Sequence, residues 1–256
     1  NAGMLTALRA ATGGTLAHRD LASAERRLER ALAQDSYGSR DAHVGLAILS
    51  EARGRYDNAA EHWLAAGYDS AQLADTASEL FRARQYAVAA NWAERATRVD
   101  PHAVGNWKLL AACYARLERW ESALDAARRA REQLASTTSG YSDLLAWLGL
   151  ICGQRLATPD PECAVEALNA AIAADRFLDE PARIGALATR ADVLYRVGRV
   201  AEAIADYEQI VALDPQRYWV LVQLGTLYWT VQNDAAAGEA SWARAAPETR
   251  VFSPVV

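Results

Sequence analysis

The sequence lacks any long run of apolar residues and any excess of positive charge. No stretch approaches the roughly 18 to 20 consecutive apolar residues that a membrane-spanning helix needs, so we predict no membrane segment in this chain. The formal net charge is -5, which argues against a nucleic-acid-binding protein because such proteins carry a basic face. Only 7 prolines and 15 glycines occur, mostly between periodic segments, and this scarcity of helix breakers is typical of a helical protein.

Cysteine is also scarce, and 3 cysteines do not make an even disulfide framework. Cys113 lies in the apolar run 109–114, where a small buried side chain is the expected role. Cys152 and Cys163 flank one loop and could meet, but a helical core of this size can stand without bridges. We therefore favour free thiols at these two positions and leave a disulfide open.

The ends of the chain carry no recognisable targeting signal. A secretion signal would open with a charged, then an apolar, then a small-residue segment, whereas residues 1–4 resemble the remnant of a cleaved expression tag. Residues 252–256 form a tail. We therefore suspect a piece of a longer protein, for which a cytoplasmic location is favoured and a periplasmic or extracytoplasmic one stays open. Lys108 is the only lysine, a bias typical of GC-rich bacterial genomes.

A period of 34 residues runs through the chain, and such periods indicate stacked helix pairs. Each unit reads as two amphipathic helices of roughly 12 to 14 residues, with apolar positions three and four apart. Small residues recur where the two helices of a pair should approach most closely, at Ala77, Ala111, Gly149, Ala191 and Gly225 on the first helices and at Ala59, Ala89, Ala123 and Ala203 on the second. Large residues such as Trp63, Trp107, Tyr114 and Tyr207 should fill the space between neighbouring pairs.

This pattern resembles that of the tetratricopeptide repeat family, which has Trp, Leu-Gly and Tyr on the first helix and Ala, an aromatic, Ala and Pro on the second. The matching residues are Trp107, Leu110, Ala111, Tyr114, Ala123 and Ala130, then Ala203, Tyr207 and Pro215, then Leu224, Gly225 and Tyr228. The resemblance implies an all-α fold, an α-solenoid in which antiparallel helix pairs form a right-handed superhelix. We expect a single domain over 5–251, with about seven units at 5–38, 40–69, 70–103, 104–137, 142–178, 184–217 and 218–251.

The pattern weakens in three places. The first helix of unit 5–38 is broken by Gly13 and Gly14. The unit at 142–178 has about three extra residues around 158–161, which lengthen its turn. In the last helix Trp242 sits one place later than expected. Terminal units of a solenoid are often atypical because one side has no neighbour.

No pattern in the sequence indicates catalysis, a cofactor or a metal. Gly13 and Gly14 lack the Lys-Ser/Thr that completes a phosphate-binding loop. The 4 histidines share no metal-ligand spacing with a cysteine or a carboxylate, and Cys163 has no nearby histidine to activate a thiol. We therefore predict that the protein is not an enzyme.

A binding face is expected on the first helices, which line the concave side of the arrays that the family forms. Aromatic and arginine side chains are enriched in protein interfaces. The predicted groove residues are Phe81, Arg82, Lys108, Arg116, Trp147, Gln154, Asp192, Tyr195, Arg196, Trp219, Gln223 and Trp229, with Arg9, Val44, Ile48 and Asp75 as earlier members. For the aromatics Trp147, Tyr195, Trp219 and Trp229, packing between pairs is an equally good interpretation.

Two hypotheses about function follow. The first is a non-catalytic scaffold that binds a protein or peptide segment in this groove. The second is a soluble accessory domain of a bacterial membrane-linked machine for polysaccharide synthesis or export, which holds partner proteins or glycan. The carboxylate clamp with which some members of the family bind chaperone tails is absent, because Ala112 stands where an asparagine is expected one turn after Lys108.

Overall fold

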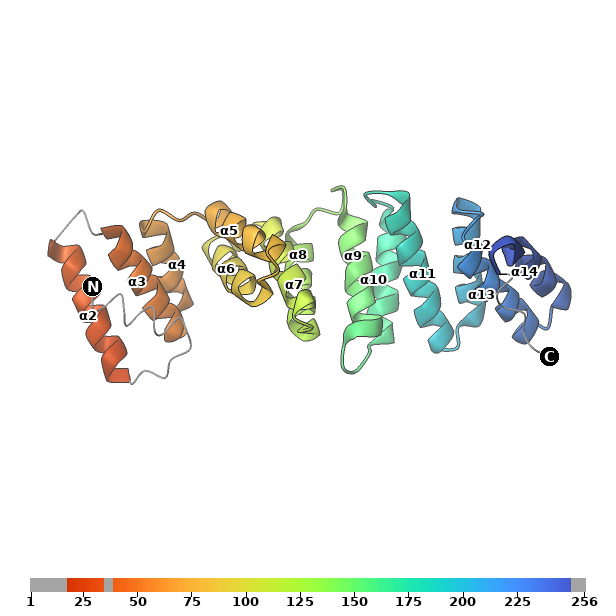
Figure 1. The fold of residues 1–256 in the computed structure, drawn as a ribbon, viewed down its shortest axis with the longest axis horizontal. Helices are drawn as coiled ribbons and strands as arrows, with labels where there is room; N and C mark the ends of the chain where they lie inside the picture. Colours follow the sequence, from red (N-terminus) through yellow and green to blue (C-terminus); the bar gives the residue numbers. More distant parts are fainter. Residues whose placement is uncertain (1–17, 35–38, 250–256) are drawn as a thin grey trace. The chain divides into compact units, whose positions relative to one another are not determined.

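The structure, a computed structural model, describes residues 18–34 and 39–249. Within these ranges it contains thirteen α-helices, one π-helical turn and no strand (Figure 1). The helices are α2 (His18–Gln34), α3 (Ser39–Ala52), α4 (Tyr56–Ala65), α5 (Ser70–Arg82), α6 (Tyr86–Val99), α7 (Val104–Arg116), α8 (Trp120–Gln133), α9 (Tyr141–Leu150), the π-helical turn η1 (Ile151–Arg155), α10 (Pro161–Ala174), α11 (Glu180–Arg196), α12 (Val200–Leu213), α13 (Tyr218–Thr230) and α14 (Ala235–Thr249). The all-α prediction is confirmed.

The contacts divide the chain into two compact units, 1–133 and 134–256. In the first unit α3 packs on α4, α5 on α6 and α7 on α8, and in the second α9 packs on α10, α11 on α12 and α13 on α14. These are the helix pairs that the 34-residue period predicts. The proposed tag remnant at 1–4, the first helix of unit 5–38 with its Arg9, and the tail at 252–256 lie outside the described residues. The exact unit boundaries stay a prediction.

Small residues allow the two helices of each pair to approach closely. Ala77, Ala111 and Ala191 are completely buried, as the sequence predicts. Gly149 shows why the position must be small, because a Cβ atom there would lie 2.5 Å from Leu168 Cγ and 3.1 Å from the Ala164 carbonyl oxygen. The period therefore reflects a steric requirement at each helix crossing.

Aspartate residues set several helix boundaries. The Asp69 side chain accepts a hydrogen bond from the Gln72 backbone N–H, and the Gln72 side chain accepts one from the Asp69 N–H, so the two form a capping box at the start of α5. Asp179 caps α11 by accepting from the Ala182 N–H. At the end of α6, Asp100 has extended backbone angles, which the following proline favours.

The first unit departs from regular stacking between its α3–α4 and α5–α6 pairs. In other steps within the units the second helix of one pair packs on the first helix of the next, as α6 does on α7, α10 on α11 and α12 on α13. Here α6, and not α5, makes the main contact with α4. The Arg95 guanidinium lies over the rings of both Trp63 and Trp92, at 4.9 and 4.8 Å from their centroids. A seam of tryptophan and arginine thus joins two second helices.

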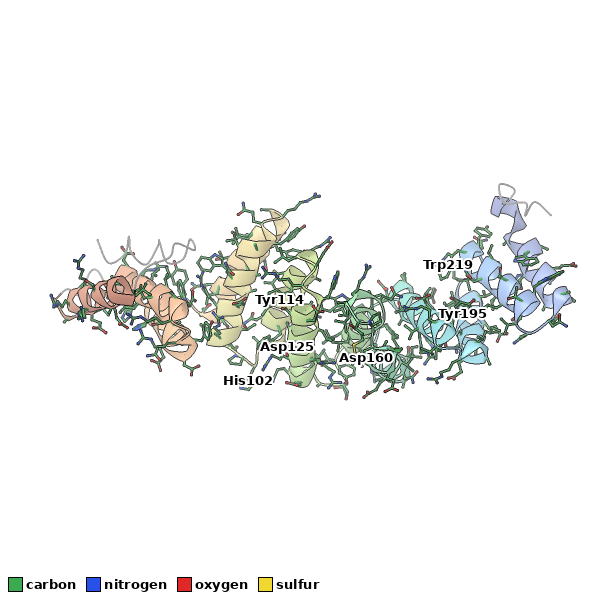
Figure 2. The ribbon with its side chains drawn as sticks, turned by 90° about the horizontal axis from the view of Figure 1, so that it is seen from below. His102, Tyr114, Asp125, Asp160, Tyr195 and Trp219 are labelled. Carbon is green, nitrogen blue, oxygen red and sulfur yellow. A yellow bond between two sulfur atoms is a disulfide. The ribbon has the colours of Figure 1, made fainter. Side chains whose placement is uncertain are left out.

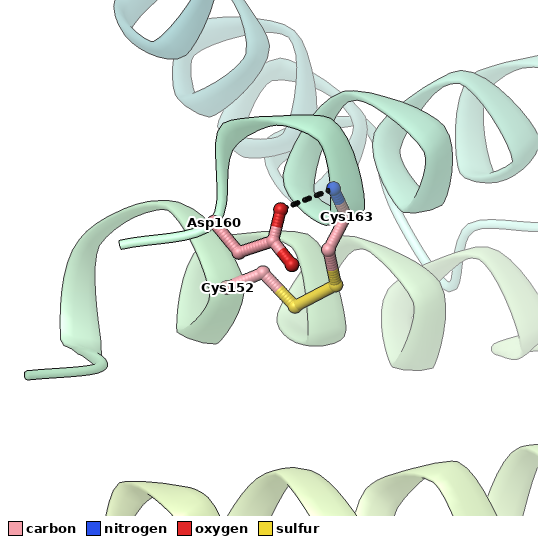
Figure 3. Close-up of a disulfide and its surroundings, with 3 residues drawn as sticks. All are labelled: Cys152, Asp160 and Cys163. Atoms are coloured by element: carbon pink, nitrogen blue, oxygen red, sulfur yellow. Dashed lines mark hydrogen bonds between the residues drawn. A yellow bond between two sulfur atoms is a disulfide. The ribbon is translucent and has the colours of Figure 1, made fainter. Parts of the chain in front are cut away.

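Two cysteines of the second unit are joined, and the prediction of free thiols at Cys152 and Cys163 is wrong. They form a disulfide with Cα atoms 5.9 Å apart (Figure 3). The lengthened turn before α10 explains the pairing, because it allows the chain to fold back until the Asp160 N–H donates to the Cys152 carbonyl at 2.8 Å. Cys113 is a free, buried cysteine, as predicted.

The last pair accommodates the displaced Trp242 through Gly225. A Cβ atom on Gly225 would lie 2.4 Å from Trp242 Nε1, so the indole occupies the space that a side chain would need. The Trp242 Nε1 donates to the Val222 carbonyl at 3.3 Å. A large residue on the second helix is therefore matched by a glycine on the first.

Candidate binding face on the first helices

The predicted groove residues all lie on first helices or on η1. In the first unit Phe81 and Arg82 end α5, and Lys108 and Arg116 lie on α7. In the second unit Trp147 lies on α9, Gln154 on η1, Asp192, Tyr195 and Arg196 on α11, and Trp219, Gln223 and Trp229 on α13. Because the two units are separate compact bodies, each face is considered by itself.

A cluster of hydrogen-bonded polar groups joins η1 to α11, and we call it the polar cluster: Gln154, Asp192, Arg196 and the Gly153 carbonyl. The Gln154 Nε2 donates to Asp192 Oδ2 at 3.0 Å. The Arg196 Nη2 lies 3.3 Å from the same carboxylate oxygen and donates to the Gly153 carbonyl at 3.0 Å. Gln154 and Arg196 are exposed, so the cluster faces solvent while its side chains hold one another in place.

Gly153 enables this contact between neighbouring first helices. It stands at the repeat position that Phe81, Tyr195 and Trp229 occupy in other units. A Cβ atom on Gly153 would lie 2.8 Å from Val193 Cγ2, so only glycine fits without a shift of the neighbouring side chain. The close approach brings the Gly153 carbonyl within reach of Arg196.

The aromatic residues of α11 and α13 are divided between packing and exposure. Tyr195, Trp219 and Trp229 are 51%, 46% and 45% exposed (Tyr195 and Trp219 are labelled in Figure 2). The Trp219 ring meets Tyr207 edge-on with centroids 6.2 Å apart, and the Trp229 ring lies 5.7 Å from Trp242. Each tryptophan therefore packs on a second helix with one part of its ring and leaves the rest accessible to a partner. Trp147 is half-buried.

Tyr207 links the aromatic and the polar parts of this face. Burial raises the pKa of its hydroxyl, and the negative charges of Asp192 and Asp206 act in the same direction. The same phenol ring meets the Trp219 ring edge-on.

The first unit presents a different chemistry. Phe81 meets the Tyr86 ring edge-on at 5.2 Å, and the Arg116 guanidinium lies 5.9 Å from the Tyr86 centroid. Arg82 and Lys108 are exposed on the same two first helices. Three cations on α5 and α7 thus accompany one aromatic pair, which Phe81 of α5 forms with Tyr86 of α6.

Two residues that the sequence places on the face of α3 belong to the core instead. Ile48 is buried, and Val44 packs against the same core cluster. The cause is the irregular seam, because α6 approaches this region and its Arg95 bonds Glu51 on α3 through two hydrogen bonds of 2.9 Å. The repeat period alone does not reveal this contact, so it predicts an exposed face on α3.

Sequence reasoning missed a pocket of about 560 Å³ on α6, α7 and α8. Trp107 and Tyr114, expected to serve packing alone, line it together with Asp125 (Tyr114 and Asp125 are labelled in Figure 2). The Tyr114 hydroxyl donates to Glu94 at 2.5 Å, and Tyr228 repeats this contact with Glu208, also 20 residues earlier. The recurring Glu-to-Tyr spacing is the sequence signal that could have located one wall of this pocket.

Side chains able to hold a metal do not gather in the described part of the chain, where no group of three or more His, Cys, Asp or Glu has suitable positions. His43 and His62 meet with their Nδ1 atoms 3.1 Å apart. Their centroids are 5.3 Å apart, so the nitrogens point at each other, as in an N–H···N hydrogen bond. Among the described helices, none is long and apolar enough to cross a membrane.

Comparisons with known proteins agree with this architecture. Tetratricopeptide repeat models match residues 184–217 and residues 16–75 and 74–137. No curated protein matches the chain in sequence. The chain is similar in fold to a crystal structure of MamA, with 17% identity over 66% of this chain and 91% of that one and a TM-score of 0.57.

Two further solved structures are similar in fold. One is YrrB, described as a tetratricopeptide repeat protein with an unusual peptide-binding site, with 17% identity over 70% of this chain and 88% of that one and a TM-score of 0.57. The other is the C-terminal part of a repeat-containing protein from Cytophaga hutchinsonii, with 15% identity over 91% and 93% of the two chains and a TM-score of 0.56. The family-model matches together span more than half of the sequence. The chain therefore belongs to the tetratricopeptide repeat family.

Proposed function

We propose that this protein is a scaffold that binds a segment of a partner protein on its first-helix faces. The observation that carries the proposal is the polar cluster together with the exposed aromatics of α11 and α13. Arg196 and Gln154 present donors that are already held by Asp192, so a partner would meet ordered groups. Ordered groups lose little conformational freedom on binding, which favours recognition.

The chemistry of this face suits a peptide. Tyr195 and Trp229 offer large, stiff apolar surfaces of the kind that dominate binding energy in interfaces. The neighbouring guanidinium and amide groups can donate to peptide carbonyls or to a carboxylate. YrrB, one of the proteins of similar fold, is described as having a peptide-binding site, which supports the choice of a peptide as the ligand to test.

The first unit would add a preference for acidic segments. Arg82, Lys108 and Arg116 are exposed on α5 and α7, and these two helices carry the small residues Ser78 and Ala112 at equivalent repeat positions. The small residues leave room for a peptide chain, and the neighbouring cations attract the carboxylates that it carries.

Selection of peptides from a phage-displayed random library tests the proposal. We expect enriched peptides to bind the purified protein, and we expect Trp229→Ala and Arg196→Ala to weaken the binding of a peptide that uses the second unit by about 10- to 100-fold, since each ten-fold corresponds to about 1.4 kcal/mol. Fluorescence anisotropy of the labelled peptide measures the dissociation constants.

Matched controls lie outside the face. Arg199 is as exposed as Arg196, at 46% against 44% of its side chain, but it pairs with Glu202 beyond the end of α11. Arg199→Ala and Leu64→Ala should leave the affinity unchanged. Failure of any peptide to enrich, or equal losses in the Arg196 and Arg199 variants, would contradict the proposal.

The disulfide favours a second candidate, an extracytoplasmic accessory domain of a bacterial membrane-linked machine for polysaccharide synthesis or export. Disulfides persist in oxidising compartments and are rare in the cytoplasm. Partly exposed indoles such as Trp219 and Trp229 can also stack on sugar rings.

Two measurements test this candidate. Binding on a glycan array that disappears in both Trp219→Ala and Trp229→Ala would support the glycan role, and an array without binding would exclude it. Thiols are trapped by acid in intact cells of the source organism and labelled with maleimide after the protein is unfolded, and Cys152 and Cys163 should then be unreactive until a reductant is added. Labelling of both without a reductant would place the protein in a reducing compartment.

A further inference from the structure

The Cys152–Cys163 disulfide lies directly beside the polar cluster in the chain. Cys152 is completely buried in η1, and the next two residues, Gly153 and Gln154, supply the carbonyl and the amide of that cluster. Cys163 lies in the first turn of α10 and is only partly buried. The bridge therefore ties the element that carries half of the cluster to the neighbouring second helix.

Backbone and capping hydrogen bonds also shape the segment between the bridged cysteines. The Leu156 N–H donates to the Ile151 carbonyl at 3.2 Å, which closes the π-helical turn. The Asp160 N–H donates to the Cys152 carbonyl, and the Asp160 carboxylate caps α10 by accepting from the Cys163 N–H at 3.0 Å (Figure 3). Both of these latter contacts join the two bridged residues through Asp160. Asp160 could no longer keep both hydrogen bonds at once if Cys152 and Cys163 were free to separate.

We infer that the disulfide positions the polar cluster, so that the second unit presents a formed binding face only in the oxidised protein. This inference rests on the proposed function as far as binding is concerned. A π-helical turn is rare, occurs mostly as a single-turn insertion in an α-helix, and is frequent at functional sites. Here the bridge fixes that turn, and the fixed turn aims the Gly153 carbonyl at Arg196 and the Gln154 amide at Asp192.

Reduction is a balanced exchange with a dithiol. A thiolate of the dithiol attacks the Sγ of Cys163, the less buried of the two residues, and the Sγ–Sγ bond breaks with Cys152 as the leaving thiolate. The second thiol of the reagent then releases Cys163, so two electrons and two protons pass to the protein and the reagent becomes a cyclic disulfide. The product has two free thiols. The segment between them is no longer closed by a cross-link and gains conformational freedom.

Hydrogen exchange of the full chain, with and without dithiothreitol, tests the positioning role without any ligand. We expect the Leu156 and Asp160 amides to exchange about ten-fold faster or more after reduction, because local opening of the turn becomes easier. The turn between α7 and α8 is the internal control, since the Arg119 N–H closes it onto the Tyr114 carbonyl without a bridge. Unchanged exchange at Leu156 and Asp160, or an equal rise at Arg119, would overturn the inference.

The Cys152→Ala/Cys163→Ala variant repeats the test without a reductant. Alanine is chosen because serine at the buried Cys152 would leave a hydroxyl in an apolar site. In an NMR spectrum of this double variant, the side-chain amide resonances of Gln154 should shift toward the position of a solvated amide. A Gln154 resonance identical to that of the oxidised protein would contradict the positioning role.

Peptide binding is the third test of the inference. A phage-selected peptide that loses affinity in Arg196→Ala should lose about ten-fold in affinity after reduction, while the Arg196→Ala protein should show no further loss. Unchanged affinity in the reduced wild-type protein would overturn the inference even if the peptide binds well. If no peptide enriches, the proposed function fails, and the exchange and NMR measurements still decide whether the disulfide positions the cluster.

Discussion

The Trp63→Ala variant is expected to lower the free energy of unfolding of the first unit by about 3 to 5 kcal/mol, the usual cost of deleting a buried tryptophan. The indole is 3% exposed, and its Nε1 donates to Glu51 at 2.9 Å. It meets the rings of Tyr68 and Trp92 at 5.6 and 5.9 Å. Removing it would open a cavity at the seam where α6 packs on α4.

Chemical denaturation followed by circular dichroism measures the effect. Trp63→Phe keeps a ring in the core but removes the hydrogen bond to Glu51, which Arg95 also satisfies, so we expect a smaller loss of about 1 to 2 kcal/mol. Trp219→Ala removes a tryptophan that is about half exposed and should cost about 1 kcal/mol, in the second unit. Equal losses in Trp63→Ala and Trp219→Ala would show that the seam contributes little to stability.

The seam also marks where prediction from the sequence ends. The helix pairs could be predicted because the crossings need small residues, and Ala77, Ala111 and Gly149 recur in step with the period. The packing of α6, rather than α5, on α4 could not be predicted. It depends on a contact between Arg95 and Glu51, which are 44 positions apart in the sequence. A periodic pattern describes the contacts inside a unit better than those between units.

The candidate site divides in the same way. The repeat phase located Gln154, Asp192 and Arg196 on adjacent first helices, and the structure joins these three by hydrogen bonds. The Gly153 carbonyl was not predicted, because a backbone acceptor leaves no mark in a side-chain pattern. The disulfide was not favoured either, since the odd number of cysteines and a self-sufficient helical core both argued for thiols.

A buried ion pair in the second unit gives the other large expected effect. Asp206 on α12 is 1% exposed and lies opposite Arg190 on α11, with hydrogen bonds of 2.8 Å to Nε and 2.5 Å to Nη2. Arg190 also donates to Asn169 on α10 at 2.7 Å. We expect Asp206→Ala to cost about 3 to 5 kcal/mol, because it leaves a guanidinium in a largely buried position without its carboxylate.

The reason for that cost can be separated from the loss of the side chain itself. A buried pair gains Coulomb energy but loses the hydration of both ions, so replacing both partners by apolar residues of similar size is often close to neutral. The double variant Arg190→Met/Asp206→Leu should therefore be clearly more stable than Asp206→Ala alone in the same denaturation measurement. If the double variant were as unstable as the single one, the contribution of the pair would come from attraction and packing rather than from the unpaired charge. In that case the three helices α10, α11 and α12 would depend on Arg190 as a true cross-link.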